Sequence, residues 1–206
     1  MMSNSLMRIG AVLLLLVTSQ LAVAAAKTIE PQEIVEQTTD QVLQALRTEG
    51  EALKKDRQRL YQLINDLIVP HFDFRQMSKW VLGPHWRKAS EPQKDEFTEQ
   101  FKLLLVRTYS DSLRELRDES VAFLPTRDRS ETEVAVRSMI TRTGGPSVPI
   151  TYQMHKLDAA WKIYDVAIEG VSLVLTYRSS FAQEIKRSGI DGLIQRLAEK
   201  NKAEHG

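Results

Sequence analysis

Residues 133–169 decide the fold of this chain and run EVAVRSMITRTGGPSVPITYQMHKLDAAWKIYDVAIE. Apolar and polar side chains alternate over residues 134–140 and again over residues 148–154. A period of two is typical of a strand with one buried face, and the intervening Gly144-Gly145-Pro146 is typical of a turn. These segments therefore predict an antiparallel hairpin. Two further strands are predicted, one at 161–169 and a shorter one at 121–124.

Helical periodicity surrounds this strand region on both sides. The best-marked helix start is Ser90, because Ser90 and Gln93 match an S-x-x-Q capping box with Pro92 in the first turn. From there one mainly apolar face continues for about seven turns. Gly50 is expected to end the first helix, and Gly189 to separate the last two. The predicted helices cover approximately residues 31–50, 55–67, 74–81, 90–116, 173–187 and 191–197.

The order of elements is helices, then strands, then helices again, which predicts an α+β fold. We expect a twisted antiparallel four-stranded sheet, ending at Gly170, with helices wrapped around it. The sequence contains no internal repeat, low-complexity tract or long linker. Residues 27–206 are therefore predicted to form a single domain.

The N-terminus has the order of features found in a secretory signal peptide. Arg8 supplies a positive charge, residues 9–17 are almost wholly apolar, and Ala22-Val23-Ala24-Ala25-Ala26 follows. The apolar stretch is about half of the roughly 20 residues that a membrane-spanning helix needs. We therefore expect residues 1–26 to be a signal peptide cleaved after Ala24 or Ala26, with an uncleaved anchor as the alternative. Because no cysteine follows, a lipoprotein anchor is not expected.

Charge and cysteine content exclude several classes of protein. Without Arg8 the 28 basic residues become 27 and balance the 27 acidic ones. A neutral chain has no long-range attraction for polyanions, so nucleic acid is not an expected partner. The cysteine count is 0, which removes disulfides and thiolate metal sites.

Motifs for metal, nucleophile or nucleotide chemistry are missing. No two histidines have the spacing that places two metal ligands on one helical face; they are His71, His85, His155 and His205. Ser172 follows Gly170 but lacks the second glycine of a nucleophile elbow, so it is interpreted as a helix N-cap. The turn at Gly144-Gly145-Pro146 is too short to hold a phosphate group. No metal and no cofactor is therefore expected.

Asp165 is the strongest catalytic candidate, because it is a carboxylate in an otherwise apolar predicted strand. Near His155 and Tyr152, with a raised pKa, it could act as an acid or base. The structural alternative is that Asp165 accepts hydrogen bonds from neighbouring backbone or from Arg178. We favour the structural alternative.

Three stretches and the C-terminal region resemble one known family. They are Leu82-Gly83 with Trp86-Arg87-Lys88-Ala89-Ser90, Phe101 with Arg107-Thr108-Tyr109, Tyr164-Asp165-Val166 through Glu169-Gly170-Val171-Ser172-Leu173, and Gly189-Ile190-Asp191-Gly192-Leu193. Together they are similar to the MlaC, or toluene-tolerance, family of periplasmic phospholipid-binding proteins of Gram-negative bacteria. The resemblance covers essentially the whole chain after the predicted signal peptide, in order.

The resemblance implies a non-enzymatic carrier in the Mla pathway, which maintains the lipid asymmetry of the outer membrane. Its cargo would be phospholipid. Its implied partners are an outer-membrane lipoprotein complex and an inner-membrane ABC transporter assembly. Its implied fold is a cone-shaped sheet wrapped by helices around an apolar pocket, similar to the cone of NTF2-like proteins.

A carrier of this kind needs a pocket for physical reasons. A phospholipid with two chains has roughly 30 methylenes, and exposing them to water at about 0.8 kcal/mol each would cost on the order of 25 kcal/mol. The lining is expected to be aliphatic and aromatic, because hydrocarbon offers no hydrogen bonds. From the strand and helix faces we predict a lipid-binding set of Val81, Leu105, Tyr109, Leu113, Val148, Ile150, Tyr152, Met154, Val166 and Val171.

The resemblance places Val148, Tyr109 and Val171 of this set against acyl chains. Each of these residues has an alternative role as ordinary core, because a sealed core and an open pocket have the same sequence pattern. Basic side chains either ring the mouth of the pocket, meet acidic docking partners or form a solvated face; they are Arg75, Lys79, Arg87 and Lys88. Two rival functions stay open: an isomerase or cyclase that uses Asp165 on an apolar substrate, and an adaptor with a closed core.

Overall fold

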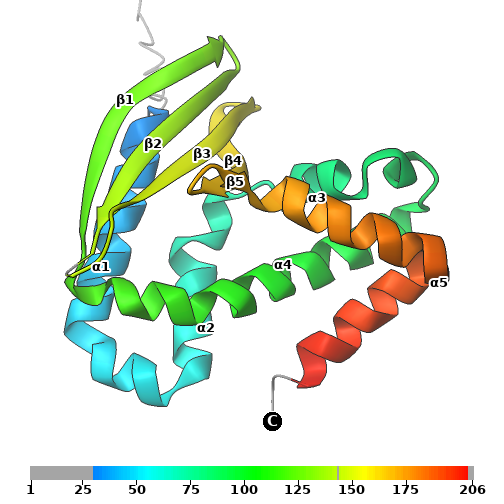
Figure 1. Ribbon diagram of the computed structural model, residues 1–206, viewed down its shortest axis with the longest axis horizontal. Helices are drawn as coiled ribbons and strands as arrows, with labels where there is room; N and C mark the ends of the chain where they lie inside the picture. The colour runs from blue at the N-terminus through cyan, green and yellow to red at the C-terminus, as the bar shows by residue number, and fades with distance from the viewer. Residues whose placement is uncertain (1–29, 143, 204–206) are drawn as a thin grey trace, which may run out of the picture.

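The computed structural model describes residues 30–142 and 144–203, apart from the side chains at positions 114, 117, 118, 128 and 203. The predicted signal peptide at 1–26 and His205 lie outside the described residues. Figure 1 shows strands gathered on one side of the molecule and helices below and beside them. The α+β class predicted from the sequence is confirmed.

The first two helices, α1 (Pro31–Lys55) and α2 (Arg57–Leu67), pack against each other. Pro31 occupies the first turn of α1, where its missing N–H has no helical partner to lose. Asp56 separates the two helices and caps the second, because its carboxylate accepts the N–H of Arg59 at 3.1 Å. In Figure 1, α2 runs back beside α1.

The prediction that Gly50 ends the first helix is wrong, since α1 continues to Lys55. Gly50 is buried, and Leu46 and Leu53 on either side of it are buried too. An interior glycine costs about 1 kcal/mol relative to alanine. The apolar surface that these leucines bury outweighs that cost, so packing overrides local propensity.

The middle of the chain contains one short α-helix between two 3-10 turns. They are η1 (Val69–His71), α3 (Phe74–Leu82) and η2 (Gly83–Arg87). Asp73 caps α3, because its carboxylate accepts the N–H of Gln76 at 2.8 Å. Gly83 ends α3 with a positive φ of 53°, a conformation that suits glycine.

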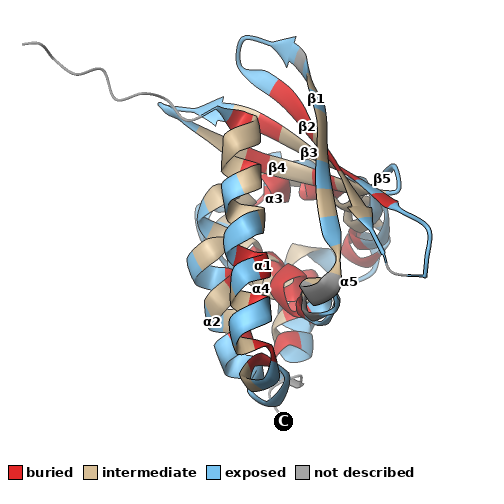
Figure 2. Cartoon of the chain, turned by 90° about the vertical axis from the view of Figure 1, so that its left-hand side faces the viewer, coloured by how far each residue is buried: buried red, intermediate tan, exposed pale blue. Residues whose placement is uncertain are grey.

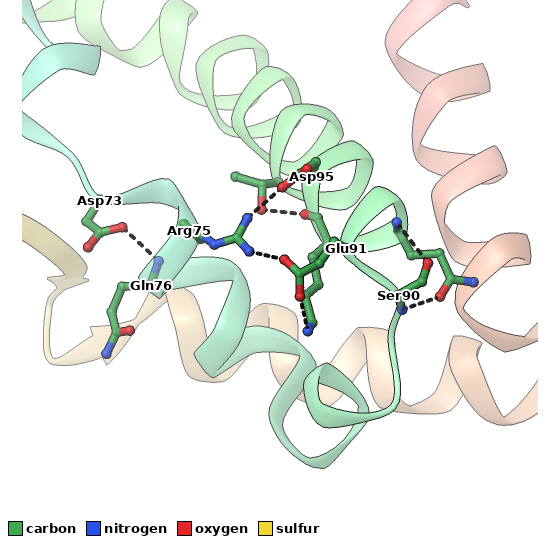
Figure 3. Close-up of polar contacts among 9 residues, drawn as sticks. Asp73, Arg75, Gln76, Ser90, Glu91 and Asp95 are labelled. Atoms are coloured by element: carbon green, nitrogen blue, oxygen red, sulfur yellow. Dashed lines mark hydrogen bonds and ion pairs between the residues drawn. The ribbon is translucent and has the colours of Figure 1, made fainter.

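The predicted capping box at the start of α4 (Glu91–Arg114) is confirmed. Ser90 Oγ accepts the N–H of Gln93 at 3.4 Å, and the N–H of Ser90 donates to Gln93 Oε1 at 2.9 Å. Figure 3 shows both bonds beside the ion pairs that tie α3 to α4. In those pairs Arg75 donates to Glu91 and to Asp95, each at 2.6 Å. The turn η3 (Glu115–Asp118) follows α4.

The strands form one antiparallel sheet in the order of the chain. The strands are β1 (Ser120–Ser130), β2 (Glu133–Thr141), β3 (Val148–Leu157), β4 (Ala160–Ile168) and β5 (Val171–Ser172). The predicted hairpin and third strand are confirmed, with Ile140 opposite Val148 at the hairpin turn.

Two predictions about the sheet need correction. It has five strands and not four, because Val171 pairs with Ile168 beyond the turn at Gly170. A strand of two residues is too short to show alternation. The strand predicted at 121–124 extends over Ser120–Ser130, with register shifts after Leu124 and Asp128 that interrupt its period of two.

The break predicted at Gly189 is present as a bend within α5 (Leu173–Ala203), which continues on both sides of it. Gly189 has φ 72° and ψ −178°, a conformation essentially reserved for glycine. Glu184 spans the bend: its carboxylate pairs with Arg196 at 2.8 Å and accepts the hydroxyl of Ser188 at 2.8 Å. These bonds lower the pKa of the Glu184 carboxyl, and the hydrogen bond from Ser188 contributes most. The C-terminal arm then returns to α4, where Asn201 donates to the backbone oxygen of Gln100 at 2.9 Å.

The buried apolar residues form three clusters. One joins α3, α4 and α5 around Phe97, Phe101 and Phe181. A second lines the sheet and includes Val35 of α1. The third joins α1, α2 and α4 around Leu53 and Leu60. Figure 2 shows buried positions on the strands at one end of the molecule and on the helices toward the other.

Candidate functional site

One face of the sheet is a continuous apolar wall. The register places Val136 opposite Tyr152 and Ile140 opposite Val148, so these side chains share a face. Tyr152 in turn lies opposite Val166 on β4. We call this face the inner wall; it comprises Val121, Phe123, Val134, Val136, Ser138, Ile140, Val148, Ile150, Tyr152, Met154, Ile163, Val166 and Ile168.

Every residue of the inner wall is buried or half-buried. Val148 is only 6% exposed and Met154 is fully buried. Ser138 is the polar exception, with a buried hydroxyl among aliphatic neighbours. Burial raises the pKa of the Tyr152 phenol, as expected for a hydroxyl in apolar surroundings.

The helical side of the candidate site lies on α3 and α4. Val81 and Leu105 are buried in the cluster that joins α3, α4 and α5, and Tyr109 is half-buried against it. Burial, together with the neighbouring Tyr177 hydroxyl, raises the pKa of Tyr109 to about 12. Tyr109 is therefore a neutral phenol at any physiological pH.

The predicted lipid-binding residues fall into four places. Val148, Ile150, Tyr152, Met154 and Val166 all lie on the inner wall. Val81, Leu105 and Tyr109 belong to the α3–α4–α5 cluster. Leu113 packs with α1 and α2 instead, and Val171 is 60% exposed on β5. The structure thus groups eight of the ten residues on two apolar surfaces.

These two surfaces belong to separate clusters and are joined mainly at β4. The N–H of Asp73, before α3, donates to the carbonyl of Ile163 at 2.8 Å. His155 and Asp73 are joined by a 2.9 Å contact between Nε2 and Oδ2. The main packing partners of α4 are the other helices and η3. The half-buried Phe72 packs against both clusters and so marks where they meet.

Sequence reasoning missed several residues of the inner wall. Val134, Val136 and Ile163 are all buried there. The alternation in residues 134–140 was visible in the sequence, but which neighbours it faces depends on the register. A hollow of about 590 Å³ opens at one end of the wall, lined by Val134 and Trp161 together with Glu30, Pro31, Gln32, Thr126, Ser130 and Glu131.

Asp165 occupies a structural position. Its carboxylate accepts the Ser172 hydroxyl at 2.5 Å and the N–H of Val174 at 3.1 Å, which anchors the start of α5 to β4. Ser172 also accepts the N–H of Leu175 at 3.1 Å, as expected of an N-cap. The structural alternative is therefore confirmed for the backbone contact, whereas the guanidinium of Arg178 lies against Gly83.

The catalytic grouping of Asp165, His155 and Tyr152 is not formed. Asp165 lies opposite Gln153, so it points to the other face of the sheet from Tyr152. His155 is bonded to Asp73.

Within residues 30–142 and 144–203 no group of three metal-binding side chains occurs. No helix in that same part of the chain is long and apolar enough to cross a membrane.

Comparison with known proteins decides the family. The family model described as MlaC protein matches residues 36–199. The chain belongs to the MlaC family. Among MlaC relatives, the toluene tolerance protein ttg2D of Pseudomonas putida is 28% identical over 188 residues, which cover 91% of this chain and 86% of that protein.

Two further relatives connect the MlaC family with phospholipid by name. The intermembrane phospholipid transport system binding protein MlaC of Haemophilus influenzae is 20% identical over 178 residues, covering 84% of this chain and 83% of that protein. A solved structure of a phospholipid-binding protein from Ralstonia solanacearum, in complex with a phospholipid, is 33% identical. It aligns with a TM-score of 0.78 over 86% of this chain and 100% of that chain.

Proposed function

We propose that this MlaC family member binds phospholipid and carries it between membranes, without covalent chemistry. The main support is the likeness in sequence and fold to the Ralstonia solanacearum protein, which holds a phospholipid. The inner wall supplies the apolar surface that acyl chains need, and it offers aliphatic contacts over most of its area. The catalytic grouping around Asp165 lacks the geometry for acid–base chemistry.

The proposed binding site lies between the inner wall and the α3–α4–α5 cluster. Acyl chains would separate these two surfaces and take contacts from Val148 and Ile150 on one side and from Leu105 and Tyr109 on the other. The residues of the two surfaces form separate buried clusters. This supports the site, because acyl chains would enter between the clusters without breaking up a single continuous core. Val171, exposed at the end of the sheet, would contact the lipid near the mouth.

We further propose that the carrier works in the periplasm, after removal of residues 1–26 as a signal peptide. It would exchange lipid with an outer-membrane lipoprotein complex and an inner-membrane ABC transporter assembly. The name of the Haemophilus influenzae relative, a binding protein of an intermembrane transport system, supports this route. A soluble carrier is needed there because exposed acyl chains would cost on the order of 25 kcal/mol in water.

Native mass spectrometry tests the binding directly. Protein purified without detergent should carry about one phospholipid molecule per protein molecule, identifiable after organic extraction. Protein that is empty, and that also takes up no lipid from vesicles, would contradict the proposal. That result would favour the adaptor with a closed core.

Asp165→Asn separates the carrier from an enzyme of the isomerase or cyclase class. The variant should keep its lipid and lose about 1 kcal/mol of stability, because the charge that strengthens the bonds to Ser172 and Val174 is removed. An enzyme that relied on this carboxylate would lose nearly all activity. Lipid content by mass spectrometry and unfolding by urea measure the two effects. Loss of bound lipid in a folded Asp165→Asn protein would count against the structural role.

A further inference from the structure

Large apolar side chains are exposed on three neighbouring elements. In the described part of the chain, Trp80 on α3 is 47% exposed, and Leu175 on α5 and Val171 on β5 are each 60% exposed. Single exposed apolar residues are ordinary, but a group of them indicates a binding surface.

The three elements are adjacent because each of them contacts β4: α3 and α5 begin beside this strand, and β5 pairs with it. Asp73, before α3, bonds to Ile163, and Val174 of α5 bonds to Asp165 two residues further along the strand. In Figure 1 both helices leave the strands in the same direction. They also pack together, since Val81 and Val174 share one buried cluster.

Trp80 and Leu175 are each close to a direct contact between these helices. The Arg178 guanidinium covers Gly83, where a β-carbon would lie 3.0 Å from Nη2. Trp80 and Leu175 each precede this contact by three residues, about one helical turn. Both side chains are exposed, Trp80 near the end of α3 and Leu175 in the first turn of α5.

The same region is basic although the chain as a whole is nearly neutral. Residues 74–90 contain two lysines and two arginines and no acidic residue. Arg75 is bonded to Glu91 and Asp95, but Lys79, Arg87 and Lys88 are exposed and form no ion pair within the described residues. On α5, Lys186 lies on the same helical face as Leu175 and Arg178.

Between Val166 and Gly189 the acidic residues are Glu169 and Glu184. Glu184 is buried and bonded to Arg187 and Arg196. Glu169, two residues before Val171, is exposed. We call Trp80, Val171 and Leu175, together with the basic residues on or next to the same elements, the basic face; these basic residues are Lys79, Arg87, Lys88, Arg178 and Lys186.

We propose that the basic face rests on an anionic lipid bilayer. The indole of Trp80 and the side chains of Leu175 and Val171 enter the interfacial layer, and the basic side chains lie over lipid phosphates. Long basic side chains can keep their stems on apolar surface while the charged ends reach the headgroups. This goes beyond lipid carriage, because a carrier that meets only protein complexes needs no bilayer contact.

Vesicle flotation of the purified protein tests the proposal. The wild type should float with vesicles rich in phosphatidylglycerol, bind weakly to phosphatidylcholine vesicles, and dissociate as salt rises. Trp80→Ser with Leu175→Ser should lower partitioning at least about tenfold on anionic vesicles. The double variant Lys79→Gln/Lys88→Gln should lower partitioning onto anionic vesicles about fivefold for each lysine removed. It should change partitioning onto phosphatidylcholine vesicles little.

Leu157→Ser is the matched control. Leu157 is 44% exposed at the far end of the β3–β4 hairpin from Val171, so its variant should float like the wild type. Equal flotation of the Trp80/Leu175 variant and the wild type overturns the proposal. Failure of the wild type to bind either membrane also overturns it, and leaves an acidic protein as the partner that fits the basic face.

Mass spectrometry on the same preparations separates this proposal from lipid carriage. Neither variant touches the inner wall, so both should hold as much phospholipid as the wild type. An empty wild type that still floats would contradict carriage alone. A loaded wild type that does not float would contradict the bilayer contact alone.

Discussion

Val148→Glu is expected to leave the protein without bound phospholipid. Val148 is 6% exposed on the inner wall, opposite Ile140 and next to Ile150. A carboxylate placed against acyl chains costs several kcal/mol, and about 3 kcal/mol already corresponds to a loss of more than a hundredfold in affinity. Lipid content per protein, measured by mass spectrometry after extraction, reports the effect.

Loss of lipid from Val148→Glu must be distinguished from an effect of the added charge elsewhere and from misfolding. Leu157→Glu adds the same charge at an exposed position away from the wall and should retain lipid. Val171→Glu, at the proposed mouth, should also lose lipid. Where Val148→Glu reduces the circular dichroism signal, Val148→Thr introduces a polar group of similar volume and should still weaken binding. Full lipid occupancy in folded Val148→Glu and Val171→Glu would show that the lining is wrong.

Phe101→Ala is expected to cause the largest loss of stability. Phe101 is fully buried and its ring meets those of Phe97, Tyr177 and Phe181, with centroids 5.2–6.0 Å apart. Removing a buried phenylalanine side chain costs about 3–5 kcal/mol, because it forfeits the buried apolar area and leaves a cavity. In a domain of this size the melting temperature should fall by about 10 °C.

Phe101→Leu is the graded control, since it keeps most of the buried volume and should cost less than half as much. Urea unfolding gives both values. A loss of stability below about 1 kcal/mol would show that the aromatic cluster is not the centre of the helical core.

Several features of the fold could be predicted because they depend on neighbours in sequence. The capping box at Ser90 needs only Gln93 three residues later. The hairpin at 134–154 needs only alternation and a glycine turn. The bend at Gly189 needs a backbone conformation that glycine adopts most easily. In each case the stabilising interaction lies within a few residues.

Features that depend on distant contacts were missed or mistaken. Gly50 continues a helix because Leu46 and Leu53 are buried against other elements. Val171 and Ser172 form a fifth strand beside β4 that no alternation in the sequence predicts. Leu113 shares the helix of Leu105 and Tyr109 but packs against α1 and α2, because α4 is long enough to contact two different clusters.

The sequence by itself determined the class of fold, the position of most elements, the family and the apolar character of the candidate lining, because periodicity, caps and motifs are local properties. The tertiary structure alone decided that five wall residues and three helix residues lie on two separate surfaces. It also decided that Asp165 bonds to Ser172 instead of meeting Tyr152, and that Trp80 and Leu175 are exposed on two helices that pack together. Strand register and helix packing bring residues together from far apart in the chain, and no local pattern encodes that proximity.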